Sequence, residues 1–165
     1  MSEKRTIEKA REDKRDGKSA STQAGEFVRE EMHHIREGEH GARSTQQAIA
    51  IGLSEARRAG VDLPPPKKGT AKRRTRKSAQ YAYAAGQGKR RPKRRPRVAR
   101  AVTKALKREP RGTASHAALS RQAERAAAQR SAASRSAAAC KAARTKGARG
   151  RSAAARKAAR TRAPG

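Results

Sequence analysis

The sequence predicts an all-α protein in which a small helical hairpin precedes a long basic tail, mostly disordered or helical only conditionally. Large apolar residues cluster between Phe27 and Leu63, and after Leu119 the chain has no Leu, Ile, Val, Met, Phe or Tyr. Residues 1–63 hold 12 Lys and Arg and 12 Asp and Glu, whereas residues 64–165 hold 32 basic residues and two acids. The net charge of +30 therefore belongs to the second part, which repels itself and does not collapse alone.

The first helix of the hairpin is predicted over residues 22–37. It follows a charged N-terminal arm, residues 1–20, in which paired acids and bases support a helix. Thr22 is a candidate N-cap, and Gly38 is a candidate left-handed stop. Apolar residues recur on one face at three- and four-residue spacing: Ala24, Phe27, Val28, Met32 and Ile35.

The second helix is predicted over residues 45–59 and stops at Gly60. Ser44 and Gln47 have the spacing of a capping box, in which each side chain reaches the backbone amide of the other. The resulting hairpin, residues 21–63, is near the lower size limit for independent folding, so we expect a homo-oligomer joined through it. The self-association residues would be Phe27, Val28, Met32, Ile35, Ile49 and Leu53.

Beyond three prolines that begin at Pro64, basic clusters alternate with short helix-prone pieces. Residues 64–97 form a linker rich in Pro, Lys and Arg, with a short helix around the two tyrosines. Residues 98–130 form short helices, the last of them capped by Thr113 or Ser115.

Residues 131–165 form a tail of Ala, Arg and Lys with an internal repeat. The segment 135–146 recurs as 151–162, and ten of the twelve positions match. Cys140 stands where the second copy has Arg156, so we interpret it as a drifted basic position. A single cysteine forms no internal disulfide, which fits a reducing compartment.

The chain lacks the material of a cleft enzyme. It has no Trp, one Phe and two Tyr, and its core is too small to hold catalytic groups rigidly. Phosphate-binding loops, glycine-rich dinucleotide turns and nucleophile elbows are missing. The longest apolar run, Ala48–Ile51, is too short to cross a bilayer, and the sequence shows no secretion signal. We expect a non-enzymatic cytoplasmic protein with no cofactor, no small-molecule substrate and no membrane partner.

Histidines among glutamates over residues 30–40 raise the question of a metal site. His33, His34 and His40 lie there, but no HExxH motif and no second Glu-x-x-His helix accompany them. His33 and His34 also point to different sides of a helix. We interpret these residues as solvated boundary residues and predict no metal ligand.

The basic tail predicts binding to nucleic acid, because Lys and Arg displace counterions condensed on phosphates regardless of base sequence. DNA is the expected partner and the nucleoid the expected location. RNA is an alternative, although only Tyr81 and Tyr83 are available to stack on bases. The candidate phosphate-binding residues are Lys67, Lys68, Lys72, Arg73, Arg74, Arg76, Lys77, Lys89, Arg90, Arg91, Lys93, Arg94, Arg95, Arg97, Arg100, Lys141, Arg144, Arg156, Lys157 and Arg160.

The hairpin also has features of a helix-turn-helix. Arg43 and the four residues after it would begin the reading helix, and such side chains reach base edges or phosphates. Against this interpretation, the connector 38–43 is longer than the usual three or four residues, and the hairpin is neutral.

A family resemblance rests on the stretch from Ser21 to Glu31, on Gly41 to Thr45, and on Ala48 to Ser54 with the prolines after it. The first 66 residues resemble a family of small basic bacterial proteins with a domain of unknown function, sometimes labelled DNA-binding or plasmid-stabilisation proteins. The rest is similar in composition to linker-histone tails and bacterial histone-like proteins. The resemblance implies no catalytic residues. It leaves two alternatives to a histone-like role: a plasmid-stabilisation or regulatory factor, and an RNA- or ribosome-associated protein.

Overall fold

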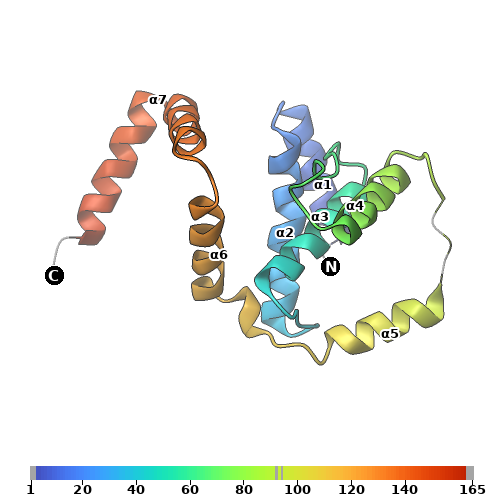
Figure 1. Cartoon of the computed structure of the whole chain (residues 1–165). Coiled ribbons are helices and arrows are strands. Elements are labelled where there is room, and N and C mark those ends of the chain that lie inside the picture. Colours follow the sequence, from blue (N-terminus) through green and yellow to red (C-terminus); the bar gives the residue numbers. More distant parts are fainter. Residues whose placement is uncertain (1–2, 92, 94, 163–165) are drawn as a thin grey trace. The chain divides into compact units, whose positions relative to one another are not determined.

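The computed structural model describes residues 3–91, 93 and 95–162, and within these ranges every regular element is a helix (Figure 1). Seven are α-helices and one is a short 3-10 helix, η1. The chain divides into two compact units, with the boundary between Gln122 and Ala123 inside one helix. In the part of the chain that the structure describes, no helix is long and apolar enough to cross a membrane.

Helices α1 (Glu3–Arg15) and α2 (Ala20–Glu37) begin the first unit. The Ser19 hydroxyl accepts a hydrogen bond from the Thr22 amide at 3.3 Å, so α2 begins before the predicted cap. Gly38 ends α2 in the left-handed region, at φ 83°, as its position in the sequence predicted.

Helix α3 (Thr45–Arg58) begins at the predicted capping residue. The Ser44 hydroxyl accepts from the Gln47 amide at 3.2 Å. The Gln47 side chain reaches one residue further back than expected, where its Oε1 accepts from the Arg43 amide at 2.9 Å. Helices α2 and α3 approach closely at Gly52, because a Cβ there would lie 2.8 Å from the Val28 Cα.

Two apolar clusters form the core of the first unit. One lies where α1 packs on α2 and α3, and contains Ala10, Ala24, Phe27, Ala56 and Val61. The other lies at the α2–α3 turn and contains Met32, Ile35, Ala42, Ala48 and Ala114, with Leu119 against it. Residues from beyond the hairpin therefore complete its core.

Helix α4 (Arg73–Gly86) packs on α3 through buried Ala79 and Ala82. The segment between α3 and α4 is anchored by Arg57, whose guanidinium donates to the carbonyl of Leu63 at 3.1 Å. Burial lowers the pKa of Arg57. The hydrogen bond from Arg57 thus holds the backbone just before the three prolines.

The chain after α5 (Pro96–Leu106) returns to the α2–α3 turn through η1 (Gly112–Ala114) and into α6 (His116–Ala128). The Gly41 amide donates to the Leu106 carbonyl at 2.9 Å. Three further bonds continue the joint: the Ala42 amide to the Pro110 carbonyl (3.2 Å), the Thr45 hydroxyl to the Thr113 carbonyl (2.7 Å) and the Arg36 Nε to the Ala114 carbonyl (2.8 Å).

The second unit contains the end of α6 and α7 (Ala132–Arg162). Gly147 interrupts α7 with non-helical dihedrals, φ 64° and ψ 178°. The two helical halves coincide with the two copies of the sequence repeat. In each copy the threonine hydroxyl donates to the lysine carbonyl four residues earlier at 3.0 Å, from Thr145 to Lys141 and from Thr161 to Lys157.

The prediction of a lone hairpin followed by a mostly disordered or conditionally helical tail is wrong. Helices α1 and α4 and the 106–119 return pack against the hairpin, and α4 to α7 make most of the described tail helical. Charge repulsion opposes compaction, but a helix pairs its interior backbone N–H and C=O groups within itself. Alanine has the highest helix propensity and arginine and lysine follow closely, which favours α7 despite its charge.

Candidate nucleic-acid interface

The predicted phosphate-binding residues are displayed on α4, α5, α7 and the segments beside them. Of the twenty, Arg94 lies outside the described residues, Arg76 is half-buried, and the other eighteen are exposed. Exposure is required of side chains that contact a large polyanion.

These positive charges have no carboxylate partners within the described chain. The Lys and Arg salt bridges among described residues involve Lys18, Arg29 and Arg43, all of them in the first 43 residues. Glu109, one of the two acids of the basic part, faces Arg43 at 3.7 Å. The described basic side chains beyond residue 64 thus form no ion pair except through solution counterions, which a polyanion would displace.

Helix α4 concentrates positive charge at its amino end. Its first turns carry Arg73, Arg74, Arg76 and Lys77 after Lys72, with no acid in the first turn and no side-chain cap. Cations are unfavourable at this end of the helix dipole, and an anion there offsets both the dipole and the side-chain charge. The arrangement favours a phosphate over a neutral ligand.

The two halves of α7 present equivalent basic pairs. Lys141 and Arg144 are three residues apart on one helical half, and Lys157 and Arg160 occupy the same positions on the other. All four side chains are exposed. Residues three apart lie on the same face of a helix, so each repeat offers one matched pair of cations.

Each of the two tyrosines contacts another side chain of the protein. The Arg90 guanidinium lies 4.6 Å from the centre of the Tyr81 ring, within the range of a cation–π contact. The Tyr83 hydroxyl donates to Asp62 Oδ1 at 2.6 Å, and this bond raises the pKa of Tyr83. Tyr81 stays 39% exposed beside Arg90, whereas Tyr83 is half-buried.

The start of α3 would read bases in a helix-turn-helix. In this structure its side chains cap the helix and bond to the 106–114 segment. The Thr45 hydroxyl bonds to the Thr113 carbonyl, and Ser44 and Gln47 form the cap of the helix. Arg43 faces Glu109. Of the five residues predicted to read bases, Gln46 alone has an exposed side chain outside these contacts.

The predicted self-association residues line the core of the chain itself. Phe27, Met32 and Ile35 are buried, and the others are half-buried against the same two clusters. The expectation arose from a hairpin too small to fold alone, and the elements packed around it remove that premise. Self-association through the hairpin stays a prediction.

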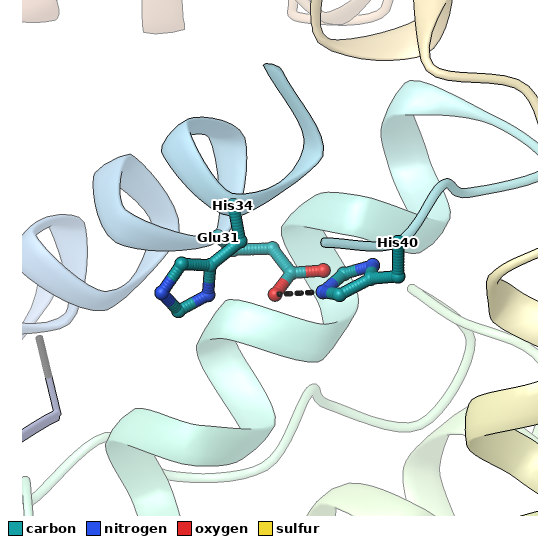
Figure 2. Close-up of side chains that lie close together, drawn as sticks. All are labelled: Glu31, His34 and His40. Carbon is teal, nitrogen blue, oxygen red and sulfur yellow. Dashed lines mark ion pairs between the residues drawn. The ribbon is translucent and has the colours of Figure 1, made fainter. Parts of the chain in front are cut away.

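A second constellation surrounds the buried carboxylate of Glu31, among the histidines and glutamates that we interpreted from the sequence as solvated boundary residues (Figure 2). Glu31 is only 1% exposed, and its Oε1 has no hydrogen-bond partner. Its Oε2 lies 3.6 Å from His40 Nε2. Burial raises the pKa of Glu31 to about 7, an effect that His40 opposes and Glu55 reinforces.

Glu31, His34 and His40 each offer a ligand atom within 4.8 Å of the others. Glu31 and His34 are three residues apart on α2, a spacing the sequence displays. His40 joins them only because the left-handed turn at Gly38 brings the chain back beside the helix. Helical periodicity carries no information about that return, which is why the sequence showed the residues but not that they meet.

Comparisons with known proteins extend to part of the first unit. Residues 15–68 match a family described as "Family of unknown function (DUF6496)". This segment runs from the end of α1 to just beyond the three prolines, and so contains the hairpin and the Glu31 cluster. A search of curated proteins and a search of solved structures found no match.

Proposed function

We propose that this protein is a non-enzymatic, nucleoid-associated, histone-like DNA-binding protein that neutralises phosphates with its basic helices, largely without regard to base sequence. The observation that carries the proposal is the set of exposed Lys and Arg side chains beyond residue 64 with no carboxylate partner among the described residues. Helices α1 to α3 would then act as a small folded anchor for the basic helices.

Engaged tyrosines and a capped α3 favour phosphate contacts over base contacts. Single-stranded RNA readers stack bases on several aromatic side chains, whereas this chain offers two tyrosines, and each already contacts another side chain. Base reading by a helix needs free side chains at its amino end, and at the start of α3 Thr45 bonds to the Thr113 carbonyl while Gln47 caps the helix. Duplex DNA, with a high and regular density of phosphate, is therefore the partner that we propose.

The matched cation pairs of α7 provide a direct test. We would replace Lys141, Arg144, Lys157 and Arg160 with Gln, which keeps helix propensity while removing four charges. Binding to a duplex of arbitrary sequence would be followed by fluorescence anisotropy over a series of salt concentrations. If all four side chains bind phosphate, the magnitude of the slope of log K against log salt falls by about 3.6, because each neutralised phosphate accounts for about 0.9 of that slope.

The control removes the same number of charges from the neutral part of the chain. Lys4, Arg5, Lys9 and Arg11 are exposed on α1, where carboxylates surround them in the sequence. The variant with Gln at these positions should keep the wild-type slope. An equal decrease in both variants would show that net charge alone governs binding, and an unchanged slope in the α7 variant would contradict the proposed interface.

A further inference from the structure

We infer that Glu31, His34 and His40 form a zinc site that fastens the α2–α3 turn. Two imidazoles and one carboxylate are a ligand set that Zn²⁺ commonly takes in proteins. Glu31 and His34 come from the last two turns of α2, and His40 comes from the connector after Gly38. A metal ion there would join the end of a helix to the chain that leaves it.

The distance between Glu31 and His40 fits a shared metal better than a hydrogen bond. The Glu31 Oε2 and His40 Nε2 atoms are 3.6 Å apart. Hydrogen bonds of this kind are shorter, near 2.7 to 2.9 Å. Two ligand atoms about 2.1 Å from a zinc ion at the tetrahedral angle lie roughly 3.4 Å from each other. Only a small movement would bring both onto one ion.

The ring of His40 is oriented as a ligand requires. Its Nδ1 lies 3.1 Å from the Gly41 carbonyl, and a carbonyl only accepts, so Nδ1 carries the proton. With the proton on Nδ1, the lone pair of Nε2 faces the Glu31 carboxylate, an arrangement in which one metal ion could bind both atoms. Metal-binding histidines typically donate their second nitrogen to a carbonyl or carboxylate in this way.

His34 is the third member of the cluster, and its side chain is more exposed to solvent than that of Glu31. Its Nε2 lies 3.2 Å from Glu30 Oε1 and 3.9 Å from Glu39 Oε2, so carboxylates are at hand to orient the ring or add a fourth ligand. His34, Glu30 and Glu39 also line a surface pocket of about 860 Å³. The cluster is therefore open to solvent on the side of His34.

The buried carboxylate supplies an independent reason for a cation. Glu31 Oε1 is buried with no hydrogen-bond partner. A buried polar group without a partner is costly, and native proteins rarely leave one. Glu55 adds negative charge near Glu31, since it is one of the groups that raise the pKa of that carboxyl. Within a chain of net charge +30, this is a local acidic site.

The test is Zn²⁺ binding to the full chain, freed of nucleic acid, measured by calorimetry. Glu31→Gln and His40→Gln remove a ligand while nearly preserving size. His33→Gln is the matched control, because His33 is an exposed neighbour on α2 that pairs with Glu37 at 3.0 Å outside the cluster. We expect one Zn²⁺ per chain in wild type and control, and a loss of affinity above about 100-fold in the two ligand variants.

Two further measurements guard against a misfolded variant. Zinc at about 100 times its Kd should raise the Tm of wild type and His33→Gln by roughly 5–10 °C and leave that of Glu31→Gln unchanged. Co²⁺ bound to the wild-type chain should show the intense visible absorption of a tetrahedral site. Equal zinc affinity in all four proteins, or only the weak Co²⁺ spectrum of an octahedral ion, would overturn the inference.

Discussion

At the scale of single residues, two glycines of the same helical hairpin meet opposite surroundings. Gly25 on α2 is exposed, and a Cβ added there meets nothing within 4 Å. Gly52 on α3 is buried, and a Cβ there would lie 2.8 Å from the Val28 Cα and 3.0 Å from the Phe27 carbonyl oxygen. Both opposing atoms belong to the backbone of α2, which does not yield as a flexible side chain would.

The two alanine substitutions should therefore change stability in opposite directions. Gly25→Ala should raise the free energy of unfolding by about 0.5–1 kcal/mol, because alanine loses less backbone entropy in a helix. Gly52→Ala should lower it by about 1–3 kcal/mol, since overpacking outweighs the gain in propensity. Urea denaturation followed by circular dichroism measures both. A stabilising Gly52→Ala would mean that α2 and α3 do not approach closely there.

Phe27 is the largest side chain of the first core cluster and is 4% exposed. Phe27→Ala should cost about 3 kcal/mol of unfolding free energy, because removal of the ring leaves a cavity between α1, α2 and α3. Denaturant unfolding of the full chain gives the value. A cost below about 0.5 kcal/mol would show that the ring does not pack between these helices.

At the scale of elements, local signals predicted the hairpin well. Gly38 and the Ser44–Gln47 cap predicted the end of α2 and the start of α3, since turns and caps depend on neighbours in sequence. The return of 106–114 was not predictable in this way. It is held largely by backbone carbonyls, such as those of Leu106 and Ala114, which every sequence provides. The Glu31 cluster forms because the chain turns at Gly38, and the sequence does not show that His40 then lies beside Glu31.

Helix α7 departs most from the sequence-based expectation of a disordered tail, and its helicity can be measured directly. The far-ultraviolet circular dichroism of the full chain, minus that of a chain ending at Ser131, should show a helical spectrum without nucleic acid. The physical reason is the high helix propensity of alanine, arginine and lysine, which favours the helical conformation in each half of α7. A random-coil difference spectrum that becomes helical only on adding DNA would contradict the structure.

At the scale of the whole molecule, charge separates the chain into two roles. The neutral first 63 residues contain nearly all the large apolar side chains of the core, whereas the 32 Lys and Arg beyond them remain exposed on most described positions. The division into a neutral part and a basic part could be predicted from the sequence, because counting charges needs no knowledge of the fold. The helical form of the basic part could not be predicted in this way. Charge counts do not show that the helix propensity of the alanines between the charges outweighs the repulsion of those charges.

Binding of these exposed cations to the phosphates of DNA is the central claim. The most direct test measures the affinity of the full chain for two duplexes of unrelated sequence over a range of salt concentrations. If a third of the 32 basic residues contact phosphate, both duplexes should give a steep and equal slope of log K against log salt, roughly −10. Tight binding to one duplex alone, with a shallow slope, would contradict phosphate neutralisation and point to base reading.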